Sequence, residues 1–166
     1  NLCKKTIMIQ RIQSLFLLLS STLYLVYWYY GLEWYLEGFN VIKNLPFLAE
    51  KNTTLHILDP LIFITTYAPL TISLLCFISI FFFKIRERQI LVCKISYFLS
   101  FLMCINTVWF FYFSLSYLAS LMPSMFMEIL LYLAIINPFI CTTLIYFSIK
   151  FIKRDSELVN SLNRIR

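Results

Sequence analysis

Residues 61–83 read LIFITTYAPLTISLLCFISIFFF, an apolar run that contains no charged side chain. A helix needs about 17–25 apolar residues to cross a hydrocarbon core roughly 30 Å thick. Leu, Ile, Phe and Val each favour insertion by about 0.3–0.6 kcal/mol at the centre of such a helix. The run therefore predicts a transmembrane helix, and it is too long for a strand of a membrane barrel.

Three further apolar runs of similar length lie at residues 12–30, 95–118 and 129–151. The whole chain has 166 residues, of which 61% are hydrophobic and 13% are charged. Soluble domains are typically about 45–50% apolar and about 25% charged. These values predict an all-α integral membrane protein whose four transmembrane helices form an antiparallel bundle.

The segments between the runs predict the connections. Residues 31–60 are expected to form an outer loop, with Asp59-Pro60 as the cap and first turn of the second span. Pro123-Ser124 marks a turn before the fourth span. In the tail, residues 152–166, Leu158, Val159, Leu162 and Ile165 recur at helical spacing, which predicts a short C-terminal amphipathic helix.

Basic residues are distributed unevenly along the chain. They outnumber acidic residues in segments 1–11, 84–94 and 150–166, whereas acidic residues prevail in 31–60 and in the turn near Glu128. Because basic residues stay on the cytoplasmic side, both termini are expected in the cytoplasm. The net charge of +6 then reflects topology and contact with lipid phosphates, and we expect no nucleic-acid partner.

Three segments together resemble a known family. They are residues 8–19 (MIQRIQSLFLLL), 83–94 (FKIRERQILVCK) and 152–166 (IKRDSELVNSLNRIR). They are similar to the small four-span bacterial proteins of domain-of-unknown-function family 4293, found in the Bacteroidota. The aromatic residues of segment 31–60 and the Asn and Cys residues within the spans depart from the usual family pattern. The resemblance implies the four-span topology and a bacterial inner (cytoplasmic) membrane, and it implies no known activity.

Residues suited to catalysis or to cofactor binding are sparse. The one histidine, His56, falls in the acidic outer segment, and the five cysteines contain no Cys-x-x-Cys pair. Cys93 is expected to face the cytoplasm. We therefore expect no enzymatic activity, no cofactor and no metal site.

Polar residues within the spans allow two interpretations. Asn106, Asn137 and Pro138 could serve interhelical hydrogen bonds, with helix kinks at Pro69 and Pro138. Alternatively, Asn106, Asn137 and the backbone that Pro138 leaves unpaired could line a binding site near the midplane.

The basic turn and the tail are the candidate contact surfaces for lipid or protein partners. The residues concerned are Arg86, Arg88, Leu158, Leu162, Arg164, Ile165 and Arg166. The leading functional hypothesis is a non-enzymatic inner-membrane accessory or assembly subunit of a larger complex. Its expected partners are membrane lipids and other membrane-protein subunits. The alternative is a membrane protein that binds lipid, quinone or another small molecule, or a minor transporter.

Overall fold

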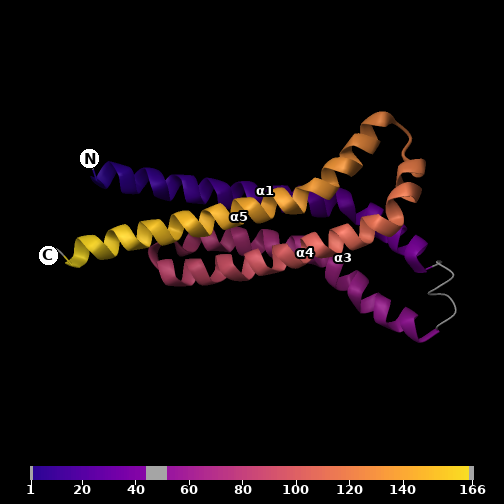
Figure 1. Cartoon of the computed structure of the whole chain (residues 1–166), viewed down its shortest axis with the longest axis horizontal. Coiled ribbons are helices and arrows are strands. Elements are labelled where there is room, and N and C mark those ends of the chain that lie inside the picture. The colour runs from indigo at the N-terminus through magenta and orange to yellow at the C-terminus, as the bar shows by residue number, and fades with distance from the viewer. Residues whose placement is uncertain (1, 44–51, 165–166) are drawn as a thin grey trace.

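A computed structural model describes residues 2–43 and 52–164 of the chain (Figure 1). The elements in this part are α1 (Leu2–Lys43), α3 (Asn52–Phe81), the short 3-10 turn η1 (Phe82–Lys84), α4 (Arg86–Leu121) and α5 (Met125–Arg164). No strand occurs within these described ranges. The all-α prediction is therefore confirmed.

The long helices run up and down and form an elongated bundle whose two termini lie at the same end (Figure 1). α1 packs against α3, α4 and α5, and α4 packs against both α3 and α5. α1 and α4 therefore form the centre of the bundle, with α3 and α5 on its flanks. We call the end that carries both termini the terminal end, and the opposite end the distal end.

Small residues form much of the contact surface of the bundle. The buried positions of α4 recur every three or four residues, as in Cys93, Ser96, Ser100, Cys104 and Thr107. This spacing is typical of helices that pack at shallow crossing angles. Large side chains in this part of α4, such as Leu91, Phe98 and Ile105, face outward, whereas Phe110, Phe111 and Leu118 nearer the distal end are buried. In a membrane the outward face meets lipid tails, so bulky apolar residues are stable there while small ones allow helices to approach closely.

Three segments are long and apolar enough to cross a membrane: Ile12–Trp34 in α1, Arg86–Leu121 in α4 and Met125–Val159 in α5. They include the first, third and fourth runs predicted from the sequence. Thr65–Phe81 in α3 is a shorter apolar helix, which lies within the second predicted run. The chain is therefore an integral membrane protein that crosses the bilayer several times.

The structure corrects the boundaries of the predicted outer loop. α1 continues to Lys43 and α3 begins at Asn52, so most of segment 31–60 is helical and Asp59-Pro60 lies inside α3. Residues 44–51 of this segment lie outside the described residues. α1 continues because Phe39, which is 1% exposed, packs on the Phe110 ring of α4 with centroids 5.0 Å apart.

The basic turn and the tail are corrected in the same way. η1 and Ile85 suffice to join α3 to α4, so Arg86 already belongs to α4. The tail is a continuation of α5 as far as Arg164 and does not form a separate amphipathic helix. α5 continues because residues beyond the apolar run are still buried at helical spacing, as Ile152 and Asp155 are. Ile152, 1% exposed, packs with Leu17 and Cys93.

The helices diverge at the distal end. There the first part of α3 and the hairpin of α4 and α5 bend away from the bundle in different directions (Figure 1). Pro69 lies inside α3 and Pro138 inside α5, and a proline within a helix removes a hydrogen bond and favours a bend. The predicted turn at Pro123-Ser124 is confirmed, since the Met127 N–H donates to Ser124 Oγ at 3.4 Å.

Candidate functional site

An ion pair at the terminal end joins the start of α4 to the last turns of α5. Arg86 Nε lies 3.1 Å from Asp155 Oδ2. The Asp155 side chain is 1% exposed, whereas the Arg86 side chain is 26% exposed. A carboxylate so deeply buried needs a charged partner, because the loss of hydration is not otherwise compensated. Arg86 therefore stabilises Asp155 within the bundle.

Two buried carboxamides accompany this ion pair. Gln13 of α1 is 3% exposed and Gln89 of α4 is 1% exposed. Along their helices, Gln13, Gln89 and Asp155 each lie one turn beyond the buried cluster of Leu17, Cys93 and Ile152, towards the terminal end. We call Gln13, Arg86, Gln89 and Asp155 the terminal layer. It is a polar layer next to an apolar one.

Several polar atoms of the terminal layer have no hydrogen-bond partner among the described residues. They are Gln13 Oε1, both polar side-chain atoms of Gln89 and Asp155 Oδ1. An unsatisfied buried polar group costs about 1–3 kcal/mol. A hydrogen-bond partner from outside the described residues would therefore stabilise the terminal layer. It contains no nucleophile, and its one carboxylate is engaged with Arg86.

A second polar group lies in the middle of the bundle and connects three helices. The Tyr24 hydroxyl of α1 lies 2.5 Å from Ser100 Oγ of α4, which lies 2.6 Å from Thr142 Oγ1 of α5. Thr142 Oγ1 also lies 3.2 Å from Cys104 Sγ and donates to the carbonyl of Pro138 at 2.7 Å. These contacts join hydroxyl and thiol groups of the chain to one another.

Further polar contacts connect α3 to its neighbours. Ser21 Oγ of α1 donates to the Ser73 carbonyl of α3 at 3.0 Å, and Ser73 Oγ donates to the Ser21 carbonyl at 2.8 Å. Ser79 Oγ of α3 lies 2.9 Å from Cys93 Sγ of α4. Such contacts stabilise helix pairs in membranes by about 0.6 kcal/mol each.

The two asparagines of the predicted midplane site lie in different settings. Asn137 Nδ2 of α5 donates to the Leu23 carbonyl of α1 at 3.3 Å, and its Oδ1 accepts from Cys141 Sγ at 3.6 Å. Asn106 of α4 is half-buried, and its Nδ2 has no partner among the described residues. Pro138 is buried. Asn137 thus connects α1 to α5, and a binding role for these residues stays a prediction.

The described part of the bundle has two open, shallow hollows on its surface that bear on the predicted sites. One, of about 270 Å³, lies between α4 and α5 and is lined by Tyr97, Thr142, Thr143, Tyr146 and Phe147. The other, of about 480 Å³, lies on α4 and is lined by Ile105, Val108, Trp109 and Tyr112. Neither is lined by Asn106, Asn137 or Pro138.

The predicted contact residues of the turn and the tail are separated by the structure. Arg86 is in the ion pair, Arg88 is exposed and Leu158 is half-buried. Leu162 and Arg164 belong to α5, but their side chains lie outside the described part. Ile165 and Arg166 lie outside the described residues altogether, so the proposed contact role of the tail stays a prediction.

Gln13 and Gln89 were not among the residues predicted from the sequence, and Cys93 does not lie where it was predicted. Cys93 is 0% exposed, so it does not present its thiol to the cytoplasm. Gln89, Cys93, Ser96 and Ser100 follow one another at spacings of four, three and four residues. A search for polar and small residues at this spacing would have found the buried face, because in a membrane such residues indicate the helix contact.

Among the described residues, no three His, Cys, Asp or Glu side chains come together in a way that could hold a metal ion.

Comparison with known proteins identifies one family. The family model described as domain of unknown function (DUF4293) matches residues 9–165. No curated protein and no solved structure matches the chain.

Proposed function

The chain belongs to the DUF4293 family, and on that basis and from the geometry of the bundle we propose that it is an accessory or assembly subunit of a larger membrane complex. In this proposal the protein has no enzymatic activity and lies in a bacterial inner membrane with four spans. The supporting observation is the apolar surface of the distal end, which continues beyond the part of the helices that lipid tails would cover.

α4 and α5 are longer than the thickness of a hydrocarbon core. α4 has 36 residues and α5 has 40, so at 1.5 Å per residue they are about 54 and 60 Å long. A hydrocarbon core of roughly 30 Å covers about 20 residues of each. If Lys94 and Lys150 lie at the inner boundary, the core ends near Ser114 on α4 and Leu130 on α5. Counted along the helices, Met125 and Phe126 lie beyond it, in the hairpin that bends away from the axis of the bundle (Figure 1).

Met125 is 79% exposed and Phe126 is 67% exposed. Outside the hydrocarbon core, exposed apolar side chains of this size favour burial against another protein. The hairpin that carries these side chains bends away from the rest of the bundle (Figure 1). A partner subunit that packs against the hairpin of α4 and α5 would cover it.

The use of polar residues inside the bundle supports a role without catalysis. Ser21 and Ser73, like Ser100 and Thr142, contact one another across helices. Asn137 connects α5 to the backbone of α1. These contacts hold the helices of the chain together and leave its outer surfaces for contacts with other molecules.

Substitution of the distal surface should disrupt the complex. In mild detergent, we expect the wild-type chain to migrate on a native gel as a particle containing other proteins. Met125→Ala with Phe126→Ala is expected to release the monomer, because it removes two large apolar contacts. The control is Phe101→Ala with Leu102→Ala, a pair of neighbouring apolar residues that is also exposed, at 50% and 45%, but lies within the length that lipid covers. A wild-type chain that purifies as a monomer with only a bound lipid or quinone would contradict the proposal and favour the alternative of ligand binding.

The proposed orientation, with both termini in the cytoplasm, can be tested with single cysteines. Because Cys93 is buried, exposed positions must be used, in a chain whose native cysteines have been replaced. Glu37→Cys, which is exposed on α1 at the distal end and lies outside the hairpin of α4 and α5, is expected to react with a membrane-impermeant thiol reagent in intact spheroplasts. Glu157→Cys, which is exposed at the opposite end, is expected to react only after lysis. The reverse pattern would show that the termini lie outside.

A further inference from the structure

The hollow between α4 and α5 combines ring and hydroxyl groups at one depth. Tyr97 of α4 and Tyr146 of α5 lie with ring centroids 6.2 Å apart, and both line the hollow of about 270 Å³. Thr143 and Phe147 extend its lining along α5. Tyrosines concentrate where lipid tails meet headgroups, since the ring is apolar and the hydroxyl is polar.

Lysines continue this surface towards the terminal end. On α5, Thr143, Tyr146, Lys150 and Lys153 recur at spacings of three and four residues, so they share one face of the helix. On α4, Lys94 lies three residues before Tyr97. Lys94, Lys150 and Lys153 are all exposed. We call Lys94, Tyr97, Thr143, Tyr146, Lys150 and Lys153 the lysine–tyrosine face.

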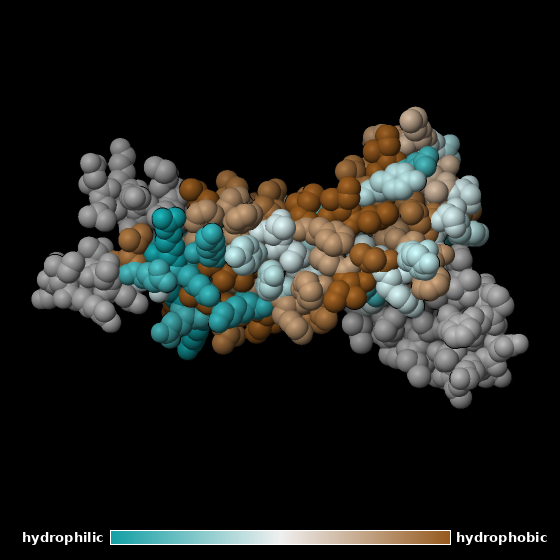
Figure 2. All heavy atoms as spheres, viewed as in Figure 1, coloured by the Kyte–Doolittle hydropathy of each residue, from teal (hydrophilic) through white to brown (hydrophobic). Residues whose placement is uncertain are grey.

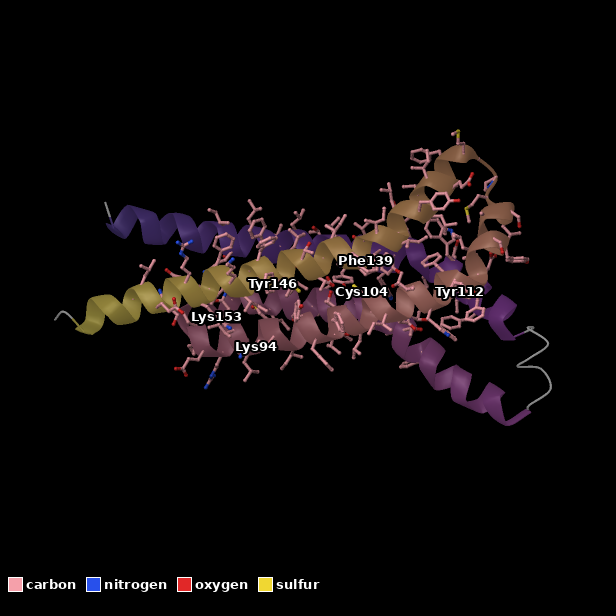
Figure 3. All side chains as sticks on the ribbon, in the orientation of Figure 1. Lys94, Cys104, Tyr112, Phe139, Tyr146 and Lys153 are labelled. Atoms are coloured by element: carbon pink, nitrogen blue, oxygen red, sulfur yellow. The ribbon has the colours of Figure 1, made fainter. Side chains whose placement is uncertain are left out.

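The figures show the same arrangement. Lys94, Tyr146 and Lys153 lie along one stretch of α4 and α5, with both lysines closer to the terminal end than Tyr146 (Figure 3). Hydrophilic residues gather over that end, while apolar residues dominate the middle of the same view (Figure 2). The hollow therefore lies just inside the level at which charged residues begin.

The charges around this face favour an anion. No salt bridge joins Lys94, Lys150 or Lys153 to an acid among the described residues. Asp155, the buried acid nearby, is paired with Arg86. The exposed acids Glu87 and Glu157 lie one to two turns further towards the terminal end than the nearest lysine of their helix. Positive charge thus prevails at the level of the lysines.

We infer that the lysine–tyrosine face binds one anionic phospholipid. The lysine ammonium groups contact the phosphate, the tyrosine hydroxyls lie at the depth of the glycerol, and an acyl chain occupies the hollow beside Thr143 and Phe147. A phospholipid fits better than a soluble anion, because the lysines adjoin an aromatic hollow on the surface that faces the bilayer. This binding is independent of the proposed role as a subunit.

The first test compares two lipids and two single substitutions. Purified chain is equilibrated with micelles that contain equal amounts of phosphatidylglycerol and phosphatidylcholine, and bound lipid is counted by native mass spectrometry. We expect one phosphatidylglycerol per wild-type chain. Lys94→Gln should reduce its retention about fivefold, the ratio that corresponds to about 1 kcal/mol per basic residue near a lipid surface. Arg88→Gln is the comparison: Arg88 belongs to the basic turn that the sequence predicts as a lipid contact, and it carries the same charge about 120° round α4 from Lys94. We expect Arg88→Gln to retain the bound phosphatidylglycerol, because Arg88 lies outside the lysine–tyrosine face.

The second test fills the hollow without changing the charge. Thr143→Trp places a large ring where the acyl chain would lie, and its thermal unfolding in detergent micelles that contain phosphatidylcholine establishes that the variant folds. We expect it to lose the bound phosphatidylglycerol while its lysines are intact. If it folds and retains the lipid as the wild type does, the inference is overturned. Equal losses with Lys94→Gln and Arg88→Gln, or equal retention of both lipids, would overturn it as well, because they indicate diffuse attraction to charge.

Discussion

Replacement of Arg86 by leucine is expected to destabilise the bundle by about 3–5 kcal/mol, the typical cost of leaving a buried charge without its partner. Asp155 is 1% exposed, and its Oδ1 already has no partner among the described residues. Removal of Arg86 also takes the partner of Oδ2, so that neither carboxylate oxygen of Asp155 has a partner among the described residues. The free energy of unfolding, measured by titration of the purified chain from mild detergent into SDS, gives the size of the loss.

A double substitution separates this effect from a general loss of packing. Arg86→Leu combined with Asp155→Leu removes both charges and is expected to recover most of the lost stability, because apolar side chains can replace a buried ion pair at little cost. Arg88→Leu is the control for the removal of a basic residue from the same turn. Arg88 is exposed, so a change of no more than about 0.5 kcal/mol is expected. Arg86→Leu with wild-type stability would show that the ion pair contributes nothing.

Replacement of Gly38 by alanine is expected to weaken the contact between α1 and α4 near the distal end. A Cβ atom at Gly38 would lie 2.3 Å from Cζ of Phe110, well inside contact distance. Phe110 is 0% exposed, and its ring is held by Phe39 at 5.0 Å and Phe111 at 5.1 Å between centroids. Overpacking of this kind costs about 1–3 kcal/mol. It exceeds the gain of up to about 1 kcal/mol in helix propensity.

The same SDS titration measures this loss of stability. Gly38→Leu, with its larger side chain, should lose more stability than Gly38→Ala. A smaller ring partner provides the rescue: Gly38→Ala combined with Phe110→Leu is expected to be more stable than Gly38→Ala alone. Glu37→Ala, at an exposed neighbouring position, is the control and should change stability by no more than about 0.5 kcal/mol. A gain in stability for Gly38→Ala would mean that Phe110 moves aside without cost.

Local sequence patterns were sufficient for the location of the apolar helices and for one of the turns. Residues 12–30, 95–118 and 129–151 each lie within a candidate span, and Pro123-Ser124 marks the turn before α5. These features depend on the composition of one contiguous stretch. Insertion of a helix into a bilayer depends mainly on that composition, so no knowledge of the other helices was needed.

The ends of the helices depended on more distant residues. The first apolar run ends at residue 30 and acidic residues follow it, so segment 31–43 was predicted to be part of an outer loop. In the bundle, Gly38 accommodates the ring of Phe110 and Phe39 packs on it, so the helix continues to Lys43. In the same way, the burial of Ile152 and Asp155 keeps the tail within α5. These contacts join residues far apart in the chain.

The composition and charge of this chain by themselves determined that it is a helical membrane protein. Only the tertiary structure decided which face of each helix lies inside and that Gln13, Gln89 and Asp155 belong to one layer. The physical reason is that lipid and protein interior are both apolar, so hydropathy does not distinguish the two faces of a transmembrane helix. Packing of small residues and pairing of polar groups set the rotation of each helix, and both depend on the neighbouring helices.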